Sequence, residues 1–297
     1  SPNPSLSPSI SSLPTEEPLP SVSSSPSRDC FFEWNQLSLA ILEAGNEGVG
    51  GTFVICPNSF FNVNDFPDPL ITPIVIRSSD ITVQCGDNGE RSNDCVISGG
   101  LNQFKLKNII VGVEFKGMKF EKSRGMSIFA GASRDSSAFF TDCEWSNNEG
   151  SSVITMAELN NTKTTLRHIN NLAMMIALRN SNFTNNDVDE AVILNEGGSL
   201  FVEKTVFLRN QAPLGAVYVT KGGSISVLES CFVENTGGAV SLNSSYTVRE
   251  DWNFGYGNTN KCDGVVDLVD GGAVQCADSC TVFEARECSV MEFDLHD

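Results

Sequence analysis

The chain has 297 residues, a formal net charge of −18 and a pI of about 4.4. This length can bury one sizeable hydrophobic core, and the strong acidity argues against binding to nucleic acid or to an anionic membrane surface. No apolar run reaches the 18 residues that a membrane span needs. Because the sequence starts at Ser1 without a basic and apolar leader, we expect a processed or trimmed product that has lost any signal peptide.

Residues 1–28 are dominated by serine and proline. A segment of this composition cannot build a core, and it predicts a disordered, extended linker. The folded domain is therefore expected at residues 29–297.

An amphipathic helix is predicted at residues 35–45, directly before a strand at 51–57. The apolar residues of this helix share one face: Leu37, Ala40, Ile41 and Ala44. Asn35 suits the N-cap and Gly45 the C-terminal end. A helix in this place would shield the open end of a solenoid, which otherwise exposes core and strand edges.

Residues 57–73 contain four prolines and are expected to form a loop over an early coil. Short β-prone runs then predict strands at 74–76, 81–85, 95–100, 113–115 and 118–120.

Three copies of one phrase follow, each with an aromatic residue, two further residues, an asparagine and a small-residue run. The phenylalanines are Phe183, Phe207 and Phe232, 24 and 25 residues apart, and the asparagines are Asn186, Asn210 and Asn235. Self-similarity at this period indicates a solenoid. A unit this short cannot bury its own apolar face, but stacked units spaced about 4.8 Å apart can.

The repeat predicts an all-β, right-handed parallel β-helix with an N-terminal capping helix. Phenylalanines and valines would form interior ladders, and the asparagines would lie at turns, where asparagine tolerates the left-handed conformation. Asparagines in register can also form hydrogen bonds along the stack. A β-sandwich in which the phrases recur by chance remains the less favoured alternative.

The repeat begins near Phe139, with Trp145 in the position of the phenylalanines. The 38 residues from Trp145 to Phe183 exceed one coil, which predicts an insertion near 158–165. After Val240 the pattern weakens, and a last coil is expected at 271–274.

Ten cysteines without paired CxxC units favour disulfides over zinc and indicate an oxidising compartment. Cys85 and Cys95 are expected to close a polar loop, and Cys30 and Cys56 to tie the cap to the first coil. Four more cysteines crowd near the C-terminal end, at 262, 276, 280 and 288. Sequons at Asn160, Asn182 and Asn243 predict a secreted glycoprotein.

The Phe-x-x-Asn phrase and the run Gly237-Gly238-Ala239-Val240 resemble the repeats of chlamydial polymorphic outer-membrane proteins. The predicted helix, the strand from Gly51, and the runs from Ile81 to Gly86 and from Cys95 to Gly100 are similar to secreted right-handed β-helix proteins of the pectin-lyase-like superfamily, as found in diatoms and other microalgae. The resemblance covers residues 30–290. It implies the fold rather than one activity, because this superfold hosts lyases, hydrolases, adhesins and passive surface proteins.

A polysaccharide-cleaving site would need converging carboxylates and a base. The best candidates are Asp187, Asp189 and Glu190 in one acidic turn, with Arg209 on a flanking strand. No cofactor is expected, although calcium could bind if enough oxygen ligands converged. Six basic residues form a second candidate site, a strip for an acidic glycan: Lys105, Lys107, Lys116, Lys119, Lys122 and Arg124. The ordinary interpretation of both groups is a solvated surface.

Two functions follow. The favoured one is a secreted, non-enzymatic β-helix at the cell surface or in extracellular matrix, with a glycan or a surface protein as its partner. The alternative is a polysaccharide lyase or hydrolase acting on an acidic glycan. An ice-binding face would need a regular outward ladder of threonine or serine, and the candidates, such as Thr155 and Thr220, are scattered.

Overall fold

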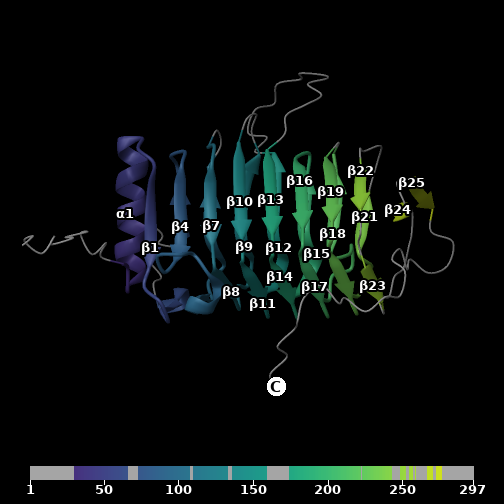
Figure 1. Ribbon diagram of the computed structural model, residues 1–297, viewed down its shortest axis with the longest axis horizontal. Coiled ribbons are helices and arrows are strands. Elements are labelled where there is room, and N and C mark those ends of the chain that lie inside the picture. Colours follow the sequence, from purple (N-terminus) through teal and green to yellow (C-terminus); the bar gives the residue numbers. More distant parts are fainter. Residues whose placement is uncertain are drawn as a thin grey trace, which may run out of the picture.

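The computed structural model describes residues 30–65, 73–107, 110–132, 136–158, 174–221 and 223–242, followed by 248–251, 254–256, 258, 266–269 and 272–275. Within these residues the chain folds as the predicted all-β parallel β-helix with a helix at its N-terminal end. Figure 1 shows the rungs side by side, with α1 (Trp34–Glu47) at one end and a hairpin of β24 (Val266–Val269) and β25 (Gly272–Gln275) at the other. The predicted linker 1–28 and most of the predicted insertion lie outside the described residues.

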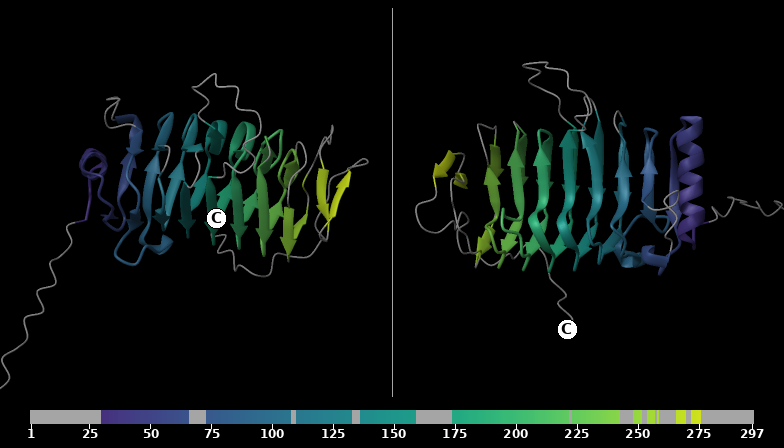
Figure 2. Two further views of the ribbon diagram at one scale, coloured as in Figure 1. Left: turned by 90° about the horizontal axis from the view of Figure 1, so that it is seen from above. Right: turned by 180° about the vertical axis from the view of Figure 1, so that it is seen from behind.

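The rungs form three parallel sheets, which are named A, B and C in the order in which the chain visits them. Each of the first seven rungs contributes one strand to each sheet, and β22 and β23 of the next rung extend sheets A and B in the described part of the chain. Sheet A contains β1 (Gly51–Ile55), β4 (Ile81–Cys85), β7 (Val113–Lys116), β10 (Ser137–Thr141), β13 (Met175–Arg179), β16 (Ser199–Glu203), β19 (Ser224–Leu228) and β22 (Val248–Asp251). Sheet B contains β2 (Phe60–Asn62), β5 (Cys95–Ser98), β8 (Met118–Glu121), β11 (Glu144–Ser146), β14 (Asn182–Thr184), β17 (Val206–Leu208), β20 (Cys231–Val233) and β23 (Phe254–Tyr256). Sheet C contains β3 (Ile74–Ile76), β6 (Asn102–Leu106), β9 (Met126–Ala132), β12 (Glu149–Glu158), β15 (Asp187–Glu196), β18 (Val217–Thr220) and β21 (Val240–Leu242). Views from above and from behind show the same order of rungs along the molecule (Figure 2).

Aromatic rings stack through the core under sheet B. Trp145 lies 4.5 Å from Phe183, Phe183 lies 4.8 Å from Phe207, and Phe207 lies 4.7 Å from Phe232, measured between ring centroids and with nearly parallel planes. The predicted ladder is therefore present, and Trp145 occupies the phenylalanine position. It also extends one rung earlier than the sequence repeat, because Phe120 stacks on Trp145 at 5.2 Å.

A buried asparagine ladder runs along the corner between sheets B and C. The side-chain amide nitrogen of each of the first four members donates to the side-chain oxygen of the asparagine in the next rung, at 2.8–3.0 Å. Each of the five members also donates to the carbonyl oxygen of an aromatic residue in the preceding rung, at 2.9–3.1 Å. The ladder consists of Asn148, Asn186, Asn210, Asn235 and Asn258. The predicted hydrogen bonds along the stack are confirmed.

The expectation that these asparagines adopt the left-handed conformation is wrong. The left-handed residue is the one before each ladder asparagine: Asn147, Asn185, Arg209 and Glu234, with φ between 53° and 54°. A non-glycine residue in this conformation costs about 1–2 kcal/mol. Because asparagine, arginine and glutamate all occupy the position, the ladder that follows imposes the turn, rather than the preference of one residue type.

Three local expectations also need correction. Helix α1 begins one residue before Asn35, and it ends at Glu47 with Gly48 (φ 68°) as its left-handed C-cap, rather than at Gly45. Residues 57–73 are not wholly a loop, because they contain β2 and the 3-10 helix η1 (Val63–Asp65). Residues 272–275 do not form another coil, because β25 pairs antiparallel with β24.

Candidate functional site

The four candidate catalytic residues lie at one corner of the β-helix, on neighbouring rungs. Asp187, Asp189 and Glu190 begin β15, and the first two are exposed. Arg209 follows β17, and its Nε lies 2.7 Å from a carboxylate oxygen of Glu234 in the following rung. Among the described residues, no three histidine, cysteine, aspartate or glutamate side chains gather where they could hold a metal ion.

The six residues of the expected basic strip are distributed over all three sheets rather than along one face. Lys105 lies on sheet C, Lys116 on sheet A and Lys119 on sheet B, while the others lie in the connections between strands. Three of them have carboxylate partners: Lys116 with Glu114 at 2.9 Å, Lys119 with Glu144 at 3.4 Å and Lys122 with Glu121 at 3.2 Å. Lys105 instead lies over the ring of Phe129, 5.4 Å from its centroid.

Of the three sequon asparagines, Asn182 is described, and Asn160 and Asn243 lie outside the described residues. Asn182 is half-buried on the outer face of β14. Oriented to satisfy both amide atoms, its side chain accepts a hydrogen bond from Arg91 and donates one to the carbonyl oxygen of Ser181 at 3.0 Å.

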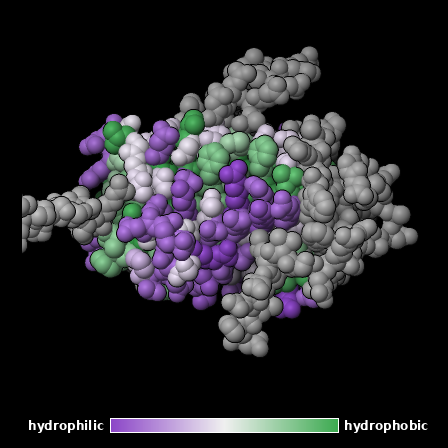
Figure 3. Space-filling view, in the orientation of Figure 1, coloured by the Kyte–Doolittle hydropathy of each residue, from purple (hydrophilic) through white to green (hydrophobic). Residues whose placement is uncertain are grey.

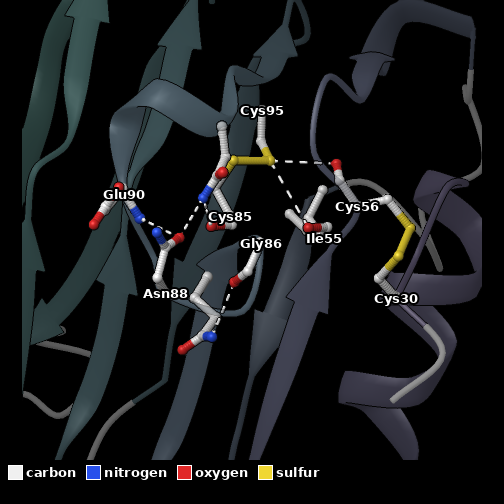
Figure 4. Close-up of a disulfide and its surroundings, with 10 residues drawn as sticks. Cys30, Ile55, Cys56, Cys85, Gly86, Asn88, Glu90 and Cys95 are labelled. Carbon is white, nitrogen blue, oxygen red and sulfur yellow. Dashed lines mark hydrogen bonds between the residues drawn. A yellow bond between two sulfur atoms is a disulfide. The ribbon is translucent and has the colours of Figure 1, made fainter. Parts of the chain in front are cut away.

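Both expected cysteine pairs are bonded (Figure 4). Cys30–Cys56 joins the segment before α1 to the end of β1, and Cys85–Cys95 closes the loop that contains the 3-10 helix η2 (Arg91–Asn93). Cys231 is also disulfide-bonded. The cysteine-rich end at 262, 276, 280 and 288 lies outside the described residues.

The loop closed by Cys85–Cys95 lies along the corner between sheets A and B. A Cβ on Gly117 would lie 2.6 Å from the backbone of Glu90, so the loop packs directly against the β7–β8 turn. From the same loop, Arg91 donates to the carbonyl oxygen of Asn180 at 2.8 Å, 89 residues further along the chain. The loop therefore fastens an early rung to a central one.

Cys143 is a buried free thiol at this same corner. It occupies a position that serine or threonine fills in later rungs, as Ser181, Thr205 and Ser230, each directly after a left-handed residue. The Sγ of Cys143 lies 3.4 Å from the carbonyl oxygen of Thr141. In the next rung the hydroxyl of Ser181 donates in the same way to the carbonyl oxygen of Arg179, at 2.9 Å. Burial raises the pKa of the Cys143 thiol to about 12, so it serves packing rather than nucleophilic chemistry.

The outer face of sheet A carries an apolar row, which lies outside the candidate sites predicted from the sequence. Inward residues of β13 such as Ile176 and Leu178 are fully buried, so the alternate residues Met175, Ala177 and Arg179 face outward. The strand register places Phe139 and Phe201 on either side of Ala177. Phe201 is 44% exposed and Ala177 is 6% exposed.

Figure 3 shows this apolar surface over β10, β13 and β16, above a largely hydrophilic lower half. The register makes it a discrete patch, because the row continues through polar residues: Glu114 beyond Phe139 and Ser226 beyond Phe201. The sequence contains one sign of this row: in Ser199-Leu200-Phe201-Val202-Glu203, the apolar Phe201 occupies a position where alternation places an outward-facing residue.

Hydrogen-bonding groups border the apolar row along both ends of its strands. On one side, Arg179 and Glu203 form an ion pair with an Nε–carboxylate distance of 3.2 Å, beside Thr141. On the other side, the hydroxyl groups of Ser199 and Ser224 lie 3.0 Å apart. The face therefore combines aromatic surface with hydrogen-bond donors and acceptors.

No helix among the described residues is both long and apolar enough to cross a membrane. The chain matches no family model and no curated protein.

Proposed function

We propose that this protein is an extracellular β-helix that binds a glycan or another surface protein without chemically changing it. The observation that carries the proposal is the apolar row Phe139–Ala177–Phe201 on the outward face of sheet A, which is bordered along the row by Glu114 and Ser226. Exposed aromatic side chains supply large contact area, and the outside of a solenoid is where such proteins bind extended partners.

An extracellular location is supported by the disulfides, since such bonds persist mainly in oxidising compartments. In this proposal the protein is a secreted glycoprotein related to the pectin-lyase-like superfamily. Its Ser/Pro-rich segment holds the β-helix away from the point of attachment.

The acidic corner of Asp187, Asp189, Glu190 and Arg209 does not carry a second proposal of equal weight. The carboxylate of Glu234 already pairs with the guanidinium of Arg209, and the two exposed aspartates lie at the start of strand β15.

The test combines binding with product formation. The full chain is applied to immobilised glycans and extracellular-matrix proteins, with calcium and with chelator, and soluble polyuronates are assayed for unsaturated sugars. We expect binding without released product. Release of unsaturated or reducing sugar ends that is lost in Asp189→Asn would overturn the proposal in favour of a polysaccharide-cleaving enzyme.

A further inference from the structure

Helix α1 covers the N-terminal end of the β-helix with one face and leaves the opposite face in solvent. Leu37 and Ile41 are buried, and the helix packs against the first strands of sheets A and C. Leu39 and Glu43 are exposed, and helical spacing places them together on the opposite side. The helix has 14 residues and is about 21 Å long. Its outer face is therefore long enough to receive a second helix.

Large apolar side chains are exposed along this outer end of the molecule. Leu39, in the middle of the helix, is 51% exposed. Phe32, just before the helix, is 71% exposed, and Val49, directly after its C-cap, is 47% exposed. One exposed apolar residue is ordinary, whereas several gathered over one element mark an interaction site. Figure 3 shows apolar and hydrophilic surface side by side at the end that α1 occupies.

The charged residues of this end are all acidic. No lysine, arginine or histidine occurs from residue 29 to residue 76, whereas α1 and its N-cap carry Glu33, Glu43 and Glu47, all of them exposed. The ion pairs found among the described residues all involve residues 114–234. The carboxylates of α1 are thus available to a cation from outside the chain.

The helix end adds to this negative charge. Glu47 lies in the last turn of α1 and Glu43 one turn earlier, and no basic residue occupies the last turn. Backbone carbonyl groups at the C-terminal end of a helix carry partial negative charge, so a carboxylate there is unfavourable and a cation is favourable. A positively charged partner would relieve this repulsion.

We propose that the outer face of α1 is a docking surface for a basic amphipathic helix of another protein. Apolar side chains of the partner pack on Leu39, and its lysines or arginines pair with Glu43 and Glu47. A second copy of this chain is the wrong occupant, because it brings the same acidic face and a net charge of −18. Residues 1–28 are also unsuitable, since Arg28 is their sole basic residue. The inference is independent of the proposed function, because α1 lies at the end of the molecule rather than on sheet A.

The experiment uses the full chain and synthetic peptides, with binding measured by fluorescence anisotropy. The main probe is an amphipathic helix of about 18 residues built from leucine and lysine. A second probe carries glutamate in place of every lysine. Measurement at physiological salt screens the long-range attraction between the basic probe and an acidic chain.

One pair of variants tests the apolar contact. Leu39→Ser removes the exposed apolar side chain from the middle of α1. Leu214→Ser is the matched control, because Leu214 is also an exposed leucine but lies between β17 and β18, far along the β-helix. Thermal unfolding of each variant confirms that it is folded.

A second pair of variants tests the charge. Glu43→Gln combined with Glu47→Gln removes two carboxylates from the docking surface. Asp87→Asn combined with Asp94→Asn removes two exposed carboxylates from the loop between β4 and β5. Both double variants change the net charge equally, so a difference between them reports where the charge lies.

We expect the leucine–lysine helix to bind the wild-type protein, with a loss of at least tenfold in affinity in both docking-surface variants and less than twofold in both controls. Absence of binding, or binding that survives both docking-surface variants, would overturn the proposal. Equal losses in the docking-surface variants and their controls would also overturn it, by showing unspecific attraction to an acidic chain. Equal affinity for the glutamate helix, or a wild-type dimer that Leu39→Ser dissociates, would overturn the choice of a basic partner.

Discussion

The side-chain amide of Asn186 donates to the side-chain oxygen of Asn210 at 2.8 Å, and the backbone N–H of Asn186 donates to the same oxygen at 3.1 Å. Both residues are fully buried. One oxygen thus satisfies two buried donors of the preceding rung. Because an unsatisfied buried polar group costs about 1–3 kcal/mol, this ladder determines both the turn and much of the local stability.

Asn210→Ala tests this relationship. The change removes the acceptor of both Asn186 donors, and we expect the free energy of unfolding to fall by at least about 2 kcal/mol. Denaturant unfolding followed by circular dichroism measures the change. Asn185→Gly is the control, because Asn185 lies directly before Asn186 in the left-handed conformation, where glycine is tolerated. Equal stability of Asn210→Ala and the wild-type protein would contradict the ladder's role.

The aromatic stack gives a second prediction. Phe207 is fully buried between Phe183 and Phe232, so Phe207→Ala should lower the free energy of unfolding by about 3–5 kcal/mol. Phe60→Ala, at an exposed position, should change it by less than about 0.5 kcal/mol. Similar effects in the two variants would show that Phe207 does not pack as described.

These two ladders are also what the sequence could predict. Phe183, Phe207 and Phe232 recur at one period, and a stacked solenoid is the arrangement that lets such short units bury them. Rungs before Phe139 lack the phrase, because Ser123 replaces the ladder asparagine after Phe120. Strand β2 was missed because it lies in the proline-rich stretch 57–73, whereas β3 was predicted with its observed bounds.

The buried thiol gives a prediction about pH. Cys143→Ser should change stability by less than about 1 kcal/mol at pH 7, because serine occupies the same position in other rungs. The folded pKa of Cys143 is raised to about 12 from an ordinary value of 9.0. The contribution of the neutral Cys143 thiol to the free energy of unfolding is therefore complete below pH 9, and it is lost as the pH rises toward 12.

Comparing the wild-type protein with Cys143→Ser isolates the ionisation of this thiol, because all other groups titrate in both proteins. At pH 10, one unit above the ordinary pKa of a thiol, the free energy of unfolding of the wild-type protein should have fallen by about 1.4 kcal/mol more than that of Cys143→Ser. Parallel stability curves from pH 8 to 10 would show that the thiol ionises freely in the folded protein. A thiol reagent should likewise leave native Cys143 unmodified at neutral pH.

The loop over the corner between sheets A and B gives a fourth prediction. Replacing both Cys85 and Cys95 by alanine opens a loop with a sequence separation of 10 residues, and we expect a loss of about 2–3 kcal/mol. Arg91→Ala removes the bond to Asn180 while leaving the disulfide intact, and the loss should be smaller, about 1 kcal/mol. An equal loss in both variants would mean that the Arg91 contact, rather than loop closure, holds this corner.

The candidate site could not be predicted to the same extent. The candidate residues chosen from the sequence were charged. Successive strands of a β-helix belong to different sheets, so basic residues close together in the sequence, such as Lys105, Lys116 and Lys119, lie on different faces. Phe139 and Phe201 are 62 residues apart in the chain, and the strand register brings them to either side of Ala177. Detecting that neighbourhood requires the length of the insertion between β12 and β13, which periodicity alone does not give.

Hydroxyl-radical footprinting of the full chain, with and without a bound oligosaccharide, tests the central claim most directly. Phe139, Met175 and Phe201 lie on three strands that are separated in the sequence but adjacent on sheet A. We expect the glycan to lower oxidation of these three residues together and to leave Phe60 unchanged. Protection confined to the corner around Asp187 and Arg209, with unchanged oxidation of Phe139 and Phe201, would contradict the account.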